Sequence, residues 1–230
     1  MTENLLIDAA GIRLTGLLAG PTDGPPLVLL HGLGLGAADF ADVLPQLAAD
    51  RRVLALDLRG HGGSGRSDAY TLELLRDDVL AALDALGLKR VDLLGHSMGG
   101  VVAYLLAGRH PERVRRLVLE DVPAPHPREE EPAVRPDGPL AFDWELVAPL
   151  RRQLYGPPAE WAAALAAVTA PTLVIAGGPT SHLPQDRVAE LARTVPDGRL
   201  HTVPVGHLVH EAAPAEFTRL VLDFLSEQPN

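Results

Sequence analysis

The chain has 230 residues, 47% of them hydrophobic, which is enough for one large domain or two small ones with a sizeable core. Its formal net charge of −10 makes nucleic acid and anionic membrane surfaces poor candidate partners. The sequence has no cysteine, which excludes disulfides and thiolate metal sites. Its first residues lack a basic segment followed by a long apolar one, and no apolar run has the length of a membrane span. We therefore expect a cytoplasmic protein that acts on a small molecule; the oligomeric state is not indicated.

The first half of the chain alternates strand-like and helix-like segments. Residues 4–9 and 11–19 predict a hairpin at a sheet edge. Continuous apolar runs, typical of strands buried on both faces, then alternate with helix-competent segments. The expected strands are 27–30, 53–56, 91–94 and 114–120, and the expected helices are 37–49, 71–86 and 101–110. This order predicts a mostly parallel sheet with helices on both faces and functional loops at the carboxyl ends of its strands.

The pattern changes at Asp121, after which nine of the 21 prolines lie between Pro123 and Pro158. Residues 122–170 predict an irregular cap over the carboxyl edge of the sheet. Within this cap, Pro149 should divide residues 141–154 into two short helices. Another helix is expected at 161–168, followed by a strand at 171–176, a helix at 184–194, a strand at 199–203 and a helix at 213–225. No linker divides the chain, so we predict a single domain over residues 1–230 that includes the cap.

The motif Gly95-His96-Ser97-Met98-Gly99 has the form G-x-S-x-G and lies between a buried strand and a helix. That context predicts a nucleophile elbow, in which the serine adopts a strained backbone conformation. Gly95 and Gly99 have no Cβ and so remove the crowding around it. The helix start supplies free N–H groups, among them that of Met98, for a developing oxyanion. Ser97 is therefore the candidate nucleophile; the alternative is a glycine-rich turn with an incidental serine.

A serine nucleophile needs an adjacent base, and the sequence offers nine histidines. His207 follows the last expected strand and precedes the final helix, which makes it the favoured base, with His210 as the alternative. His96 should point away from Ser97. The other histidines are expected to shape loops (His31, His61), to lie in cap-like or surface loops (His126, His182), to end a helix (His110) or to lie within a strand (His201).

Four motifs in this order resemble the α/β-hydrolase family. They are His31-Gly32 after the first buried strand, residues 57–64 after the second, the elbow, and Gly206-His207 before the last helix. The resemblance covers nearly the whole chain. It implies an α/β-hydrolase fold with an eight-stranded, mostly parallel sheet and a short cap after the sixth strand. It also implies an oxyanion hole formed by the N–H groups of Leu33 and Met98, with no metal or organic cofactor.

The expected acid of the triad departs from the commoner family pattern, which places a carboxylate after the seventh strand. Residues 177–184 contain no Asp or Glu. Some family members carry the acid at the end of the sixth strand, where Asp121 lies. Glu120 and Asp186 remain alternatives, although adjacent carboxylates on a strand point to opposite faces, so only one of Glu120 and Asp121 should reach the histidine.

The favoured function is a serine hydrolase that cleaves a small, largely apolar carboxylic ester through an acyl-enzyme with Ser97, His207 and Asp121. Candidate substrate-binding residues are His31, Gly32, Phe142 and Trp144, although the aromatic residues of the cap are equally suited to attaching it to the sheet. The alternatives are a thioesterase, a C–C hydrolase or a cofactor-free perhydrolase with the same triad, or a non-catalytic binder of small molecules.

Overall fold

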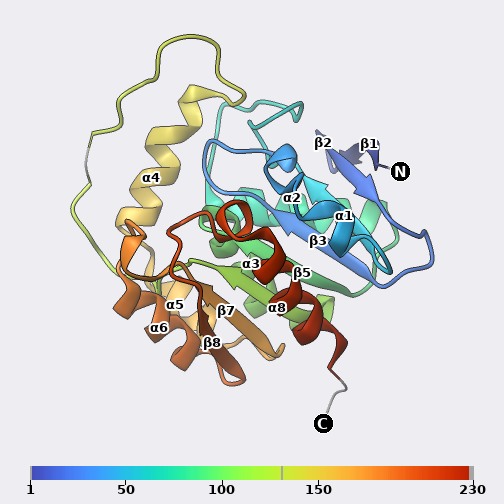
Figure 1. Cartoon of the computed structure of the whole chain (residues 1–230). Coiled ribbons are helices and arrows are strands. Elements are labelled where there is room, and N and C mark those ends of the chain that lie inside the picture. The colour runs from blue at the N-terminus through green and yellow to red at the C-terminus, as the bar shows by residue number, and fades with distance from the viewer. Residues whose placement is uncertain (1, 131, 228–230) are drawn as a thin grey trace.

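The computed structural model describes residues 2–130 and 132–227 (Figure 1). Eight strands form one sheet in the order β1-β2-β4-β3-β5-β6-β7-β8. Strand β2 is antiparallel to β1 and β4, and all the other neighbouring strands are parallel. The strands are β1 (Thr2–Ala9), β2 (Ile12–Ala19), β3 (Pro26–Leu30), β4 (Arg52–Leu56), β5 (Val91–His96), β6 (Val114–Glu120), β7 (Thr172–Ala176) and β8 (Gly198–Thr202). This is the predicted α/β-hydrolase architecture.

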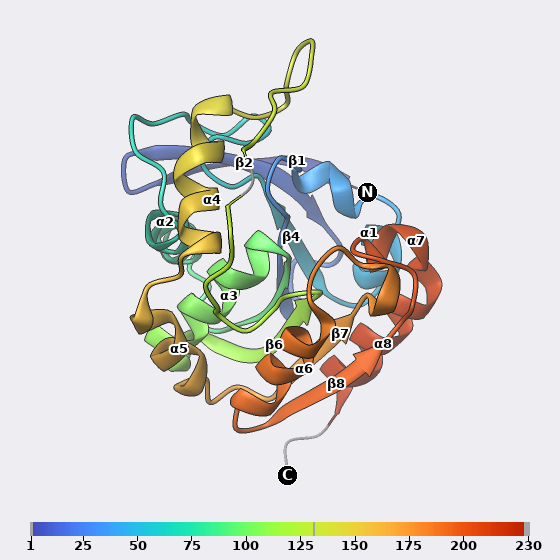
Figure 2. The ribbon, with the colours of Figure 1, turned by 90° about the vertical axis from the view of Figure 1, so that its left-hand side faces the viewer.

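Helices cover both faces of the sheet, whose edge strands β1 and β8 lie on opposite sides of the molecule (Figure 2). Alternate residues of one strand face opposite layers, as the strand period requires. Val28 and Leu30 belong to the core shared with α2, α3, α5 and α6, whereas Leu27 and Leu29 belong to the core shared with α1 and α8. The helices are α1 (Leu44–Leu47), α2 (Leu72–Ala85), α3 (Met98–Arg109), α4 (Val147–Tyr155), α5 (Ala159–Ala166), α6 (Gln185–Thr194), α7 (Val209–Ala212) and α8 (Pro214–Ser226).

Two proline positions change the predicted helices. The single helix expected at 37–49 is a 3₁₀ helix, Ala37–Phe40, followed by the short α1 that begins next to Pro45. Proline lacks an N–H and its ring clashes with the preceding turn, so it separates the two pieces. Pro149 does not break the helix around it, because it lies in the first turn of α4, where the N–H has no intrahelical acceptor. Helix α7 has no counterpart among the predicted elements.

The segment between β6 and β7 is attached to the helices beneath it by buried side chains and hydrogen bonds. Trp161 Nε1 donates to Glu73 Oε1 of α2 at 2.7 Å, and Gln153 Nε2 donates to Glu73 Oε2 at 2.7 Å. Gly108 of α3 lets α5 approach closely, since a Cβ there would lie 2.0 Å from the carbonyl oxygen of Ala164. Helix α4 thereby holds its position beside the carboxyl ends of the strands (Figures 1 and 2). Within the described ranges, no helix has the length and apolarity of a bilayer span.

Candidate active site

Ser97 lies at a strained turn between β5 and α3. Its φ of +50° is in the region that L-residues rarely adopt. A Cβ on Gly95 would lie 2.4 Å from the carbonyl oxygen of Gly99, and a Cβ on Gly99 would lie 2.3 Å from that of Leu30. The N–H of Ser97 donates to the carbonyl oxygen of Glu120 at 3.0 Å, which ties the turn to β6. The chain tolerates this backbone because the residues two positions before and two positions after Ser97 are both glycine.

Asp121 and His207 form a hydrogen-bonded pair beside this turn. His207 Nδ1 lies 2.7 Å from Asp121 Oδ2, so the ring donates to the carboxylate and leaves Nε2 free. The loop that carries His207 is joined to the loop after β7 by the main chain, because the N–H of Gly206 donates to the carbonyl oxygen of Gly177 at 2.9 Å. No side chain fits between them, since a Cβ on Gly177 would lie 2.2 Å from the carbonyl oxygen of Gly206.

The Asp121 carboxylate is fully buried and accepts three further hydrogen bonds from the loop after β7. Ser181 Oγ donates to Oδ2 at 2.5 Å, and Gln185 Nε2 and the N–H of Gly177 donate to Oδ1 at 3.0 and 2.9 Å. Burial raises the pKa of Asp121, but the hydrogen bonds from His207, Ser181, Gln185 and Gly177 outweigh it, so the pKa is lowered overall. The stretch that lacks a carboxylate thus supplies the donors that hold Asp121 ionised, a role that the sequence reasoning did not assign to Ser181 or Gln185.

Two more histidines surround His207. His182 lies in an exposed loop, as expected, and its ring is edge-on to that of His207, with ring centroids 4.4 Å apart. The His96 ring is 4.6 Å from that of His207, and its Nε2 donates to the His207 carbonyl oxygen at 3.1 Å. Burial, with the neighbouring His207 and His210, lowers the pKa of His96 well below its usual value, so the ring is neutral. His96 and Ser97 both line the same cavity.

Glu120, one of the alternative acids, pairs with His210 and not with His207. His210 Nδ1 lies 2.8 Å from Glu120 Oε2, and its Nε2 lies 3.0 Å from Asp39 Oδ2. Burial lowers the pKa of His210, but the two carboxylates outweigh it and raise the pKa to about 10. A histidine that stays protonated at neutral pH cannot accept a proton from serine. The other alternative acid, Asp186, begins α6 with 80% of its side chain exposed.

Asp39, His96 and His210 present ligand atoms within 4.8 Å of one another, a spacing that a metal ion would accept. The raised pKa of His210 opposes metal binding there, because a ligating imidazole nitrogen must be free of its proton. His210 is better described as a member of a buried ion pair with Glu120 that joins β6 to α7.

His31 and His61 hold the loop after β3, as the sequence predicts. His31 Nδ1 donates to the carbonyl oxygen of Gly32 at 2.7 Å, and His61 Nε2 accepts from the N–H of Gly34 at 3.2 Å. Phe142 packs over this loop, since a Cβ on Gly34 would lie 3.3 Å from its ring. His31 is fully buried, and Phe142 contacts this loop.

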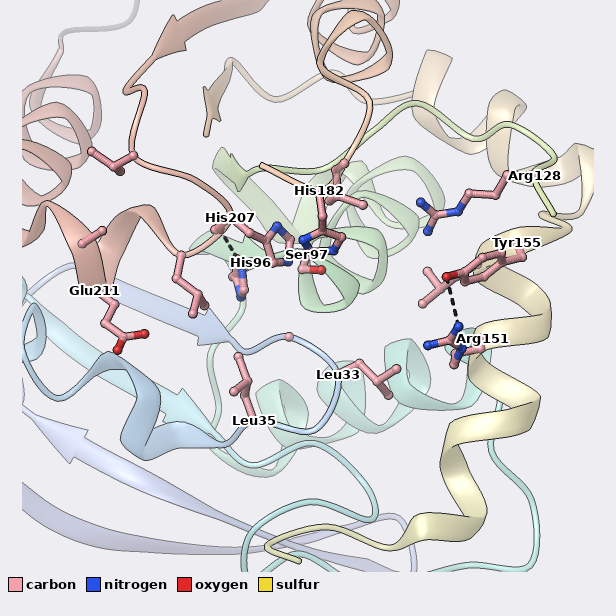
Figure 3. Close-up of a pocket in the computed structure, with 16 residues that line it drawn as sticks. Leu33, Leu35, His96, Ser97, Arg128, Arg151, Tyr155, His182, His207 and Glu211 are labelled. Carbon is pink, nitrogen blue, oxygen red and sulfur yellow. Dashed lines mark hydrogen bonds between the residues drawn. The ribbon is translucent and has the colours of Figure 1, made fainter. Parts of the chain in front are cut away.

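A cavity of about 820 Å³ contains Ser97 and His207 (Figure 3). Of the predicted substrate-binding residues, Gly32 is among the described residues that line it, as is Leu33 of the predicted oxyanion hole, whereas His31, Phe142 and Trp144 are not. Trp144 instead packs against the core. Most of the remaining lining side chains are apolar or positively charged: Leu35, Leu154, Leu183, Val205, Leu208, Ala212, Arg128 and Arg151.

An eight-stranded, mostly parallel sheet with a serine at a strained strand-to-helix turn defines the α/β-hydrolase class of folds. The alpha/beta hydrolase fold family matches residues 25–145. A putative carbamate hydrolase of Pseudomonas savastanoi pv. phaseolicola is 30% identical, and the alignment covers 90% of this chain and 95% of that protein. The chain therefore belongs to the α/β-hydrolase fold family.

Two further similarities have different extents. A 2-hydroxymuconate semialdehyde hydrolase of Pseudomonas sp. (strain CF600) is 48% identical over 49% of this chain, and the match spans only 41% of that relative's length. The crystal structure of a hypothetical protein from Pseudomonas aeruginosa PAO1 is 28% identical, with a TM-score of 0.82. It covers 98% of this chain and 100% of its own. The whole sheet and the segment above it therefore have a close structural counterpart.

Proposed function

We propose that this protein is a serine hydrolase that cleaves small, largely apolar carboxylic esters through an acyl-enzyme. The observation that carries the proposal is the 2.7 Å hydrogen bond from His207 to Asp121 at a cavity that also contains the strained Ser97. The leucine side chains of the cavity suit the apolar part of such a substrate.

In the proposed reaction, His207 Nε2 accepts the proton of Ser97 as Oγ attacks the ester carbonyl carbon. The carbonyl oxygen becomes an oxyanion that accepts hydrogen bonds from the N–H groups of Leu33 and Met98. Met98 suits this role because α3 begins with it, so its N–H has no intrahelical acceptor. The alcohol leaves with the proton from His207, and the acyl group remains on Ser97.

Water completes the cycle. His207 removes a proton from water, whose oxygen attacks the acyl carbon, and the second tetrahedral intermediate breaks down to the free acid and Ser97. Asp121 keeps its negative charge throughout: it holds the proton on Nδ1 of His207 and stabilises the imidazolium that forms in each half-reaction. The donors around Asp121 support this role because they favour the ionised carboxylate.

The test is labelling of Ser97 by a fluorophosphonate probe together with turnover of a panel of esters. Ser97→Ala should abolish both while circular dichroism and the unfolding transition stay unchanged. Ser226→Ala, at the exposed end of α8, is the matched control and should label and turn over as the wild type does. If the Ser97→Ala protein were still labelled, or turned over esters at more than a few per cent of the wild-type rate, Ser97 would not be the nucleophile.

The named relatives carry different substrate names, so the bond that is cleaved needs its own comparison. A panel with one acyl chain presented as an oxygen ester, a thioester and a 1,3-diketone separates ester, thioester and C–C hydrolysis. We expect the oxygen ester to give the highest kcat/KM. A larger value for the thioester or the diketone would reassign the activity while leaving the triad in place.

A further inference from the structure

The cavity beside Ser97 has opposite charges at its two ends. Arg128 and Arg151, from the segment between β6 and β7, line one end, and Glu211 of α7 lines the other. Figure 3 shows Ser97 and His207 between these ends. A substrate at Ser97 therefore meets a positive potential in one direction and a negative one in the other.

The Tyr155 ring holds the Arg128 guanidinium in place. Arg128 Cζ lies 4.3 Å from the ring centroid, and the main-chain N–H of Arg128 donates to the carbonyl oxygen of Tyr155 at 2.8 Å. Arg151 contacts the same ring at 5.0 Å and donates to Tyr155 Oη at 3.1 Å. Because this packing orders the Arg128 side chain, little conformational freedom remains to be lost when a ligand binds.

Arg128 has this ordered position without an anionic partner among the described residues. Its Nε is buried and forms no hydrogen bond with them. Burial lowers the pKa of Arg128, and the nearby Arg151 charge lowers it further, although a guanidinium stays charged at neutral pH. A chain with 30 acidic and 20 basic residues has carboxylates in excess, yet none of the described ones pairs with this arginine. A partly buried, unpaired guanidinium favours an anion.

Arg128 also lies close to the reacting groups. It lines a second, smaller recess of about 50 Å³ together with Ser97, Met98 and Leu183. Its positive charge contributes to the lowered pKa of His182, after burial and the His207 charge, and the His182 ring contacts His207. An anion bound at Arg128 is thus within the reach of a short chain attached at Ser97.

We propose that Arg128 is a carboxylate-binding residue and that the substrate is an ester whose short apolar chain ends in a carboxylate. The inference rests on the proposed function and names the substrate class of that site. The leucine side chains contact the methylene groups, and the Arg128 guanidinium donates charge-assisted hydrogen bonds to the carboxylate. Glu211 disfavours the reverse orientation, because it would face the carboxylate with a like charge.

The test compares substrates that differ in one charge. Mono-4-nitrophenyl esters of dicarboxylic acids of increasing chain length are paired with the same compounds methylated at the free carboxylate. In a second set of substrates, the carboxylate is on the alcohol part of the ester. These are acetyl esters of hydroxy acids, paired with their methyl esters, and their hydrolysis is measured by the release of acid. The measured quantity is the ratio of kcat/KM for the anionic substrate to kcat/KM for its neutral partner. At the best chain length, we expect this ratio to exceed one for the wild-type protein in at least one of the two sets.

Arg128→Gln should lower this ratio about 10- to 100-fold, which corresponds to the loss of one charge-assisted hydrogen bond. Arg128→Lys should retain part of it, because the charge remains but the fork geometry is lost. The matched control is Arg152→Gln, which removes a charge from an exposed position of helix α4, next to Arg151, that is not among the cavity-lining residues. It should leave the ratio within about twofold of the wild type.

Binding is measured separately, so that the site is tested even without turnover. Calorimetry with adipate monomethyl ester and adipic acid dimethyl ester, in Ser97→Ala protein, should show tighter binding of the anion. Adding Arg128→Gln should remove that preference. Equal binding of the two ligands, or an anion preference that survives Arg128→Gln, overturns the proposal.

The outcomes separate this inference from the proposed function. A wild-type protein that labels with fluorophosphonate and hydrolyses the neutral esters, but has a ratio at or below one, retains the function and loses the subsite. A protein without a reactive serine loses the function, and the binding measurement then decides the subsite alone. A shifted pH profile in Arg128→Gln with an unchanged ratio would assign Arg128 to the electrostatics of His182 and His207 instead.

Discussion

Replacing Asp121 by Asn isolates the contribution of the buried carboxylate. Asn can keep its oxygen at the Oδ1 position, where it still accepts from Gly177 and Gln185. Its NH₂ group then replaces Oδ2 and faces Ser181 and His207, which both donate to that oxygen in the wild type. The Ser181 hydroxyl can rotate and accept, whereas the imidazole must lose its proton at Nδ1 to do so.

The consequence for catalysis is a change of tautomer. With Nδ1 accepting from Asn, the proton of a neutral His207 is on Nε2, and no lone pair is available for the Ser97 proton. We expect kcat to fall by about 10³- to 10⁴-fold, as in the serine protease template, with little change in KM. The lowered pKa of Asp121 gives a second readout, which is the pH dependence of stability. The ionised carboxylate stabilises the fold at pH values above 3.8, the ordinary pKa of Asp, and this contribution is lost as the pH falls through the lower pKa of the folded state. Asp121→Asn should lack that part of the acid dependence.

Steady-state kinetics on a 4-nitrophenyl ester, with denaturant unfolding of each variant, makes the comparison. Asp186→Asn is the control, because this exposed carboxylate at the start of α6 should change kcat less than about tenfold. Ser181→Ala should also cost less than Asp121→Asn, since His207 keeps its acceptor. If Asp186→Asn were the more damaging change, or if folded Asp121→Asn stayed within tenfold of the wild type, the assignment of the acid would be refuted.

Three further predictions concern packing and charge around the site. Gly99→Ala should abolish activity and destabilise the fold, because the new Cβ would lie 2.3 Å from a main-chain oxygen. Gly156→Ala is the control, since its Cβ would have its nearest contact at 3.4 Å, and denaturant unfolding should show that this change is tolerated. Glu120→Gln should lower the unfolding free energy by about 3 kcal/mol or more at pH 6, since it leaves the His210 charge with one partner fewer. Because the pKa of His210 is raised to about 10 from 6.5, the difference between this variant and the wild type should shrink as the pH rises from about 6.5 through 10, and a constant difference would contradict the raised pKa. His182→Ala should reduce kcat by about two- to tenfold and His182→Phe by less, since only phenylalanine keeps the ring contact with His207; equal losses would exclude a packing role.

Local chemistry made most of the fold predictable. Apolar runs bounded by turn residues located the strands, and the elbow could be identified because glycine at positions 95 and 99 is a steric requirement that acts within a few residues. The same local reasoning fails at proline when the position within the helix is unknown. Pro45 and Pro149 both lie in the first turn of an α-helix, where the missing N–H costs no hydrogen bond, so each proline marks the start of a helix and not a break within one.

The sequence by itself determined the order of strands and helices, the strained position of Ser97, and the fact that Glu120 and Asp121 must face opposite ways. These properties follow from backbone sterics and from the two-residue period of a strand. Only the tertiary structure decided which histidine meets which carboxylate, because His207 and His210 are 86 and 90 residues from Asp121 and Glu120.

The substrate side of the cavity was also decided by the tertiary structure. Phe142 and Trp144 have the composition of pocket residues, but both are partly buried, Phe142 against the loop after β3 and Trp144 against the core. Arg128 lies in a proline-rich segment without hydrophobic periodicity, so its sequence context resembles that of a solvated charge. The Tyr155 ring, 27 residues away, turns it towards Ser97, and that long-range contact between a cation and an aromatic face leaves no local pattern in the sequence.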